Sequence, residues 1–133
     1  MSKVTGLGFK FELDTSGGAL TDISNDVNDI QFGTPRGMQD VTGLDKSAIE
    51  RLLLLGDGKV TIKGTYNAAL SHTVLSTIPS TSVTRTSKMT LPGGAVLSME
   101  MVWSDYAIGR DATGKLTWTA TGDLADGTVP TWA

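Results

Sequence analysis

The stretch of sequence that decides the fold is Thr21–Asn67, which reads TDISNDVNDIQFGTPRGMQDVTGLDKSAIERLLLLGDGKVTIKGTYN. Its end, Lys59–Tyr66, alternates between small or apolar side chains and polar ones. Successive side chains of a β-strand point to opposite faces, so this alternation predicts a strand with one buried and one exposed face. The side chains expected on the buried face are those of Val60, Ile62, Gly64 and Tyr66.

A hairpin is predicted in the first half of the same stretch. Its two strands and the turn between them are Asn28–Gly33, Gln39–Thr42 and Thr34–Gly37. The proline pre-sets the second position of such a turn, and the glycine after it supplies a positive φ. In the first strand Ile30 and Phe32 share one face, while Asp29 and Gln31 share the other. One face of this strand is therefore expected to be buried and the other exposed to solvent.

The middle of the stretch, Asp45–Leu55, allows two interpretations. Ser47 followed three residues later by Glu50 fits a helix capping box, and the residues AIERLLLL form helices well. The four consecutive leucines, Leu52–Leu55, also fit a buried extended segment. Of the two, we favour the helix.

The rest of the chain adds further alternating segments and one helix. Strands are predicted at Phe9–Leu13, Thr81–Leu91, Ala95–Ile108 and Lys115–Thr121. A helix is predicted over Ala68–Ile78, between an Asn67 cap and a Pro79 stop. Residues 1–8 and 122–133 are rich in glycine and small polar residues and are predicted to be arms. The sequence therefore predicts a mainly β fold, an antiparallel β-sandwich or barrel with one flanking α-helix, as a single domain of residues 1–133.

Composition excludes several classes of function. The 133 residues contain no cysteine, so the chain has no disulfide framework and no thiolate metal site. The net charge of −3 disfavours tight nucleic-acid binding, which needs a basic patch to neutralise phosphates. No apolar run approaches the ~20 residues of a membrane span, and MSKVTGLGFKFEL lacks the apolar centre of a signal peptide. We expect a protein without a membrane anchor that is made in the cytoplasm.

Three sequence features suggest chemistry and do not sustain it. Gly109–Leu116 matches a phosphate-binding loop except at its last position, where leucine replaces the magnesium-binding hydroxyl, and a strand rather than a helix follows. Asp22, Ser24, Asp26 and Asn28 have the spacing of the first calcium-loop ligands, but no glutamate closes the loop. His72 is the single histidine. We expect no enzyme activity, no catalytic residue, no metal site and no cofactor.

The order of segments resembles that of the tail tube (major tail) proteins of long-tailed bacteriophages. The segments that carry the resemblance are the acidic DIS turn at residue 22, the hairpin, the DVTG at residue 40, the helix or loop, the GDGKVTIKGTY strand, and the chain end at 122–132. The resemblance implies a β-sandwich that forms hexameric rings, stacked into a hollow conduit for DNA ejection. It also implies partnership with tape-measure and other tail proteins, and a location in the virion tail after assembly in the host cytoplasm.

The resemblance also implies roles for individual residues. The hairpin would line the lumen with Asp29, Gln31 and Asp40, with Arg36 near its tip. The remaining hairpin residues, expected at contacts between subunits, are Ile30, Phe32, Pro35 and Gly37. The residues expected to make contacts from the two arms are Leu7 and Trp132. DNA would pass without sequence-specific binding, because acidic walls repel phosphate over a Debye length of ~8–10 Å.

The alternative is a β-sandwich binding module, either a carbohydrate-binding or a capsid-decorating protein. Such a module would present exposed aromatic side chains on a strand face, and Trp103, Trp118 and Trp132 are the candidates. Trp103 and Trp118 alternate with buried-face residues and are expected in the core.

Overall fold

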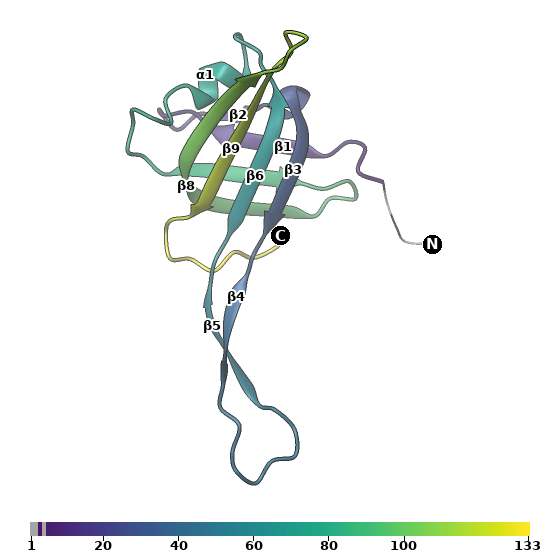
Figure 1. Cartoon of the computed structure of the whole chain (residues 1–133), viewed down its shortest axis with the longest axis vertical. Coiled ribbons are helices and arrows are strands. Elements are labelled where there is room, and N and C mark those ends of the chain that lie inside the picture. Colours follow the sequence, from purple (N-terminus) through teal and green to yellow (C-terminus); the bar gives the residue numbers. More distant parts are fainter. Residues whose placement is uncertain (1–2, 4) are drawn as a thin grey trace.

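The computed structural model describes residue 3 and residues 5–133. Their secondary structure is β1 Lys10–Asp14, β2 Leu20–Asp22, a 3-10 turn η1 Ser24–Asp26, β3 Val27–Gly33, β4 Arg36–Asp40, β5 Arg51–Gly56, β6 Lys59–Thr65, α1 Ser71–Leu75, β7 Arg85–Thr90, β8 Val96–Arg110 and β9 Leu116–Leu124. The predicted mainly β, antiparallel fold with one helix is confirmed (Figure 1). No described helix has the length and apolar character needed to cross a membrane.

Seven strands form one strongly bent sheet in the order β2-β1-β7-β8-β9-β6-β3. The 15-residue strand β8 lies in the middle and belongs to both parts of the sheet, because it pairs with β7 up to Met101 and with β9 from Met101 onward. A bulge between Trp103 and Asp105 lies just beyond this change of partner, and bulges bend strands. The two parts of the sheet cross steeply and face one another (Figure 1). We call β2, β1, β7 and residues 96–101 the first half-sheet, and residues 102–110, β9, β6 and β3 the second.

The core fills the space between the half-sheets. Strand β8 alone supplies four buried side chains by strict alternation, those of Leu97, Met99, Met101 and Trp103. The other buried apolar side chains come from both half-sheets, the residue before η1 and the helix region: Phe11, Leu13, Ile23, Val60, Ile62, Val74, Leu75, Ile78, Met89, Trp118 and Ala120. The predicted buried face of Lys59–Tyr66 is correct for Val60, Ile62 and Gly64, while Tyr66 is half-buried.

Helix α1 is shorter than the predicted Ala68–Ile78. Leu70 has a non-helical φ of −131°, and the chain on both sides of α1 forms turns. Asn67 does not cap the helix; its side-chain oxygen accepts the amide of Ala69, as in a local turn. The start of α1 is held instead by Asp26, whose carboxylate accepts the Ser71 amide at 3.0 Å.

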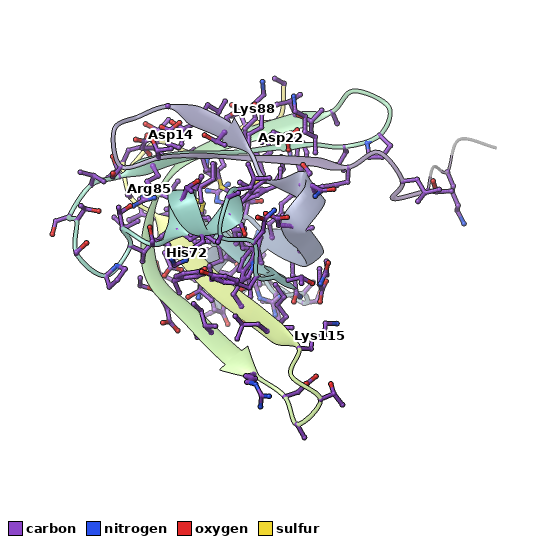
Figure 2. The ribbon with its side chains drawn as sticks, turned by 90° about the horizontal axis from the view of Figure 1, so that it is seen from above. Asp14, Asp22, His72, Arg85, Lys88 and Lys115 are labelled. Carbon is purple, nitrogen blue, oxygen red and sulfur yellow. The ribbon has the colours of Figure 1, made fainter. Side chains whose placement is uncertain are left out.

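Arg85 joins α1 and the turn after it to the first half-sheet. Its guanidinium is buried, and it donates to the Val74 carbonyl at 2.7 Å and to Thr77 Oγ1 at 2.6 Å. Burial lowers the pKa of Arg85 from its usual value, and the nearby charge of Asp14 partly opposes this (Figure 2). Because carbonyl and hydroxyl groups accept its hydrogen bonds, the buried charge of Arg85 is compensated, and the side chain has a structural role.

Replacing Arg85 by methionine is expected to lower the free energy of unfolding by about 2 kcal/mol, since the Val74 carbonyl then stays buried without its partner. Lys88, on the same strand, makes no such bonds and points away from the core (Figure 2). Lys88→Met is the matched control and should change stability by less than about 0.5 kcal/mol. Urea denaturation of both variants measures the difference, and equal midpoints would contradict the assigned role.

The predicted hairpin of Asn28–Gly33 with Gln39–Thr42 is wrong. Strand β3 pairs with β6, because Ile30 and Phe32 then lie beside the core residues Ile62 and Val60. Strand β4 pairs with β5 in a separate two-stranded sheet. Gly37 lies within β4 and has no positive φ.

The helix favoured within Asp45–Leu55 is also wrong. Arg51–Gly56 is extended as β5, because it pairs with β4, with Leu53 opposite Met38. Residues 41–50 form the tip between the two strands. Figure 1 shows this hairpin, which we call the arm (Arg36–Gly56), projecting far from the seven-stranded sheet.

Candidate assembly site

The second half-sheet has two free edges. Strand β3 pairs with β6 on one side, and no described strand pairs with its other side. Strand β8 pairs with β7 only up to Met101, so its residues 102–110 have no described partner on the side away from β9. The unpaired amides and carbonyls of such edges are a template for pairing with another chain.

The outer face of the second half-sheet is polar and dominated by small side chains. The threonines on this face are Thr61, Thr65, Thr117, Thr119 and Thr121. Its charged side chains are those of Asp29, Asp105, Asp123, Lys59 and Lys63. Three negative and two positive charges leave a net charge of −1, and Asp29 lies directly opposite Lys63. The face is therefore weakly acidic and has no large apolar patch.

The four residues predicted to line a lumen do not lie together. Asp29 and Gln31 are exposed on the outer face of the second half-sheet. Arg36 and Asp40 are on the arm, because the hairpin that would have joined them to β3 does not exist. Arg36 Nε donates to the Leu54 carbonyl at 3.0 Å. The hydrogen bonds that Thr42 donates to Asp40, from its hydroxyl and its amide, lower the pKa of that carboxyl.

The predicted subunit-contact residues also separate into two groups. Ile30 and Phe32 are half-buried and pack against the core, so β3 is an integral strand of the seven-stranded sheet. Pro35 and Gly37 belong to the arm and its root. The Pro35 carbonyl accepts the Asp57 amide at 3.0 Å, and this bond closes the base of the arm.

The arm exposes large apolar side chains on both of its faces. Strand alternation places Leu53 on the same face as its partner Met38, and Leu52 on the opposite face with Gln39. The exposed large apolar residues of the arm are Met38, Val41, Leu44, Ile49, Leu52, Leu53, Leu54 and Leu55. Contiguous exposed apolar surface of this kind marks an interaction site. The run Leu52–Leu55, expected in a helix or a buried extended segment, is instead exposed on β5.

The two terminal segments differ in how they contact the fold. Leu7 is 83% exposed. Trp132 packs on Phe32 with ring centroids 6.1 Å apart, and Ala133 exchanges two backbone hydrogen bonds with Val96. Gly122–Leu124, assigned from the sequence to the C-terminal arm, belong to β9, where Gly122 lies under Trp103.

Comparison with known proteins finds solved structures of similar fold. No protein-family model and no curated protein matches the chain. A chain from the tail of an empty gene transfer agent particle, refined with C6 symmetry, aligns with a TM-score of 0.79 and 14% identity over 98% of this chain and 99% of that one. The fold is shared with this tail subunit.

Two further structures show the same likeness. A chain in the virion of a native gene transfer agent particle aligns with a TM-score of 0.79 and 13% identity, over 98% of this chain and 99% of that one. A chain of the six-fold symmetrised baseplate of the anti-feeding prophage aligns with a TM-score of 0.68 and 10% identity, over 100% of this chain and 97% of that one. At these identities the likeness is one of fold.

The side chains that suggested chemistry are engaged within the fold. Residues 109–116 form the end of β8, a tight turn and the start of β9, near Lys115 in Figure 2, and Asp111 accepts bonds from Thr113 and Lys115. Asp22 bonds Ser24. Asn28 bonds Thr65, and His72 Nδ1 lies 3.1 Å from the Tyr106 hydroxyl. No group of metal ligands occurs among the described residues. Trp103 and Trp118 are core residues rather than exposed binding platforms.

Proposed function

We propose that this chain is a structural subunit of a phage tail tube, whose copies join through the free edges of the second half-sheet into hexameric rings. The rings stack into a hollow conduit through which DNA leaves. The observation that carries the proposal is the pair of free edges, β3 on one side and residues 102–110 of β8 on the other. Pairing with another copy completes these two open edges, and closure of the ring leaves neither of them free.

The strand directions allow such a ring without rearrangement. Within the second half-sheet β8, β9, β6 and β3 are antiparallel in turn, so β8 and β3 run in opposite directions. A rotation axis along the barrel keeps the β8 strands of all copies parallel to one another. The β8 strand of the next copy then meets β3 antiparallel, and the whole barrel is antiparallel. Six copies are proposed because the tail of similar fold was refined with C6 symmetry.

The outer face of the second half-sheet is the one we assign to the lumen. The inner face is covered by the first half-sheet and the core, so it cannot face an open channel. The outer face is polar, threonine-rich and weakly acidic, which suits a wall along which DNA slides without being held. Asp29 and Gln31 lie on it, whereas Arg36 and Asp40 do not.

The arm is assigned to stacking of the rings. It continues β3 and β6 beyond the sheet, and so projects past the rim of a ring built from these strands (Figure 1). Its exposed leucines would be buried against a subunit of the next ring. The terminal segments, with Leu7 and Trp132, add further contacts between subunits. Tape-measure and other tail proteins are the remaining proposed partners, in a virion tail assembled in the host cytoplasm.

Changing Asp29 and Gln31 together to lysine is expected to slow DNA passage several-fold at low salt, because each ring then presents many additional phosphate contacts. Tubes should still form, since neither residue is packed in the core. The control is Glu12→Lys on β1, in the first half-sheet and outside the proposed lumen. The readout is the ejection rate of particles carrying each variant over a range of ionic strengths. Equal rates for all three proteins at every salt concentration would remove these residues from the channel.

Electron micrographs of the concentrated purified protein test the proposed function. Rings and hollow tubes are expected. Binding to glycans by a protein that stays monomeric at every concentration would favour the binding-module alternative instead.

A further inference from the structure

An apolar groove runs between the start of β1 and the free edge of β3. Its volume is about 490 Å³. The apolar side chains that line it are those of Phe9, Phe11, Val27, Ile30 and Phe32, with Leu7 at its rim. Asp29 is the single charged residue among those that line it. Because Val27, Ile30 and Phe32 pack against the core, the groove lies on the inner side of β3, at an edge that has no described partner strand.

The other free edge of the second half-sheet presents an apolar side chain on the corresponding side. Ile108 of β8 pairs directly with Trp118, which is 1% exposed, so Ile108 also points to the inner face. Ile108 is nevertheless 45% exposed. On the same strand Val102 is 44% exposed but points to the outer face, since its neighbours Met101 and Trp103 are buried.

We propose that Ile108 of one copy fills the groove between β1 and β3 of a second copy of this chain. This inference rests on the proposed edge-to-edge ring and names the side chain by which one copy recognises the next. When β3 and the β8 strand of the next copy pair, their inner faces continue one another, so Ile108 reaches the groove while Val102 turns to the opposite face.

The registers within the sheet give the level at which Ile108 arrives. Val27 is paired with Gly64, Gly64 with Trp118, and Trp118 with Ile108. The same sequence of strand pairings, from β3 through β6 and β9 to β8, places Ile30 level with Tyr106. A ring without stagger would place Ile108 beside Val27 of the next copy, and a stagger of two residues toward the arm would place it beside Ile30. Both of these residues line the groove.

Two aspartate substitutions test the inference, one at Ile108 and one at a control position. Ile108→Asp places a charge in the groove and should raise the protein concentration needed for ring formation at least about ten-fold, the equivalent of losing one buried aliphatic side chain. Thr117→Asp, on the exposed outer face of β9 and away from both free edges, should change this concentration less than about two-fold. Sedimentation velocity measures ring formation, and circular dichroism confirms that both variants are folded.

Cysteine pairs provide a second test, which does not require an aspartate variant to fold. The chain has no cysteine of its own, so any disulfide must come from the introduced residues. Ile108→Cys combined with Val27→Cys or Ile30→Cys should give covalent multimers on oxidation, and the pair that reacts reports the stagger. Val102→Cys with the same partners should give none. If the unmodified protein forms no rings, the proposed function fails and the inference with it. Rings that form normally with Ile108→Asp and show no cross-link at position 108 overturn the inference alone.

Discussion

Replacing Arg36–Gly56 by the dipeptide Asn-Gly is expected to leave the seven-stranded sheet folded and to stop assembly at single rings. The Asp57 amide already donates to the Pro35 carbonyl at 3.0 Å, which is the bond that closes a two-residue turn. β3 and β6 would then form an ordinary hairpin. The arm contributes no buried side chain to the core, so the loss of the arm costs the fold little. Tube formation should fall at least about ten-fold, since many exposed apolar side chains are lost together.

A second variant separates the length of the arm from its apolar surface. Leu53→Ser combined with Leu55→Ser keeps the arm and its pairing but removes two of its exposed apolar side chains. The same arrest at rings is expected, and electron micrographs together with sedimentation velocity distinguish rings from tubes. Tubes of normal length from the protein that lacks Arg36–Gly56 would show that the arm does not join the rings.

Gly64→Ala is expected to destabilise the fold more than Arg85→Met does. A Cβ at Gly64 would overlap the carbonyl oxygen of Asp26, which is backbone, and would approach Trp118 to 2.6 Å. The backbone of η1 or β6 would therefore have to move, and overpacking of this kind costs about 3 kcal/mol or more.

The matched control is Gly109→Ala in β8, where a Cβ would meet nothing within 4 Å. Alanine is more favourable than glycine in a strand, so this variant should be as stable as the parent or slightly more stable. Urea denaturation compares the two. Midpoints that differ by less than the equivalent of about 1 kcal/mol would show that the contact between β6 and η1 yields easily.

The strands that could be predicted from sequence are those with one buried face and one exposed face. Lys59–Thr65, Val96–Trp103 and Leu116–Thr121 each have a core on one side and solvent on the other, so their alternation is visible without a structure. The arm has solvent on both sides, and its leucines occupy consecutive positions. A four-leucine run carries no period of two, and local helix signals then outweigh the true strand.

The candidate site was predictable only where it depends on a single strand. Asp29 and Gln31 could be placed opposite Ile30 and Phe32 from alternation alone. The lysines that share their face, Lys59 and Lys63, could not be assigned to it, because that requires the pairing of β3 with β6. The free edge of β8 beyond Met101 is likewise a property of topology, since it follows from the shortness of β7. Long-range pairing leaves no signal in a single sequence.

The most direct test of the proposed ring is the strand order in a cryo-electron microscopy map of the assembled protein. The edge-to-edge ring predicts a closed, all-antiparallel barrel around a hollow axis, in which β3 of each subunit is hydrogen-bonded to residues 102–110 of β8 in the next, with six subunits in each ring. A map in which these two edges stay unpaired, or in which the polar outer face of the second half-sheet points away from the axis, would contradict it.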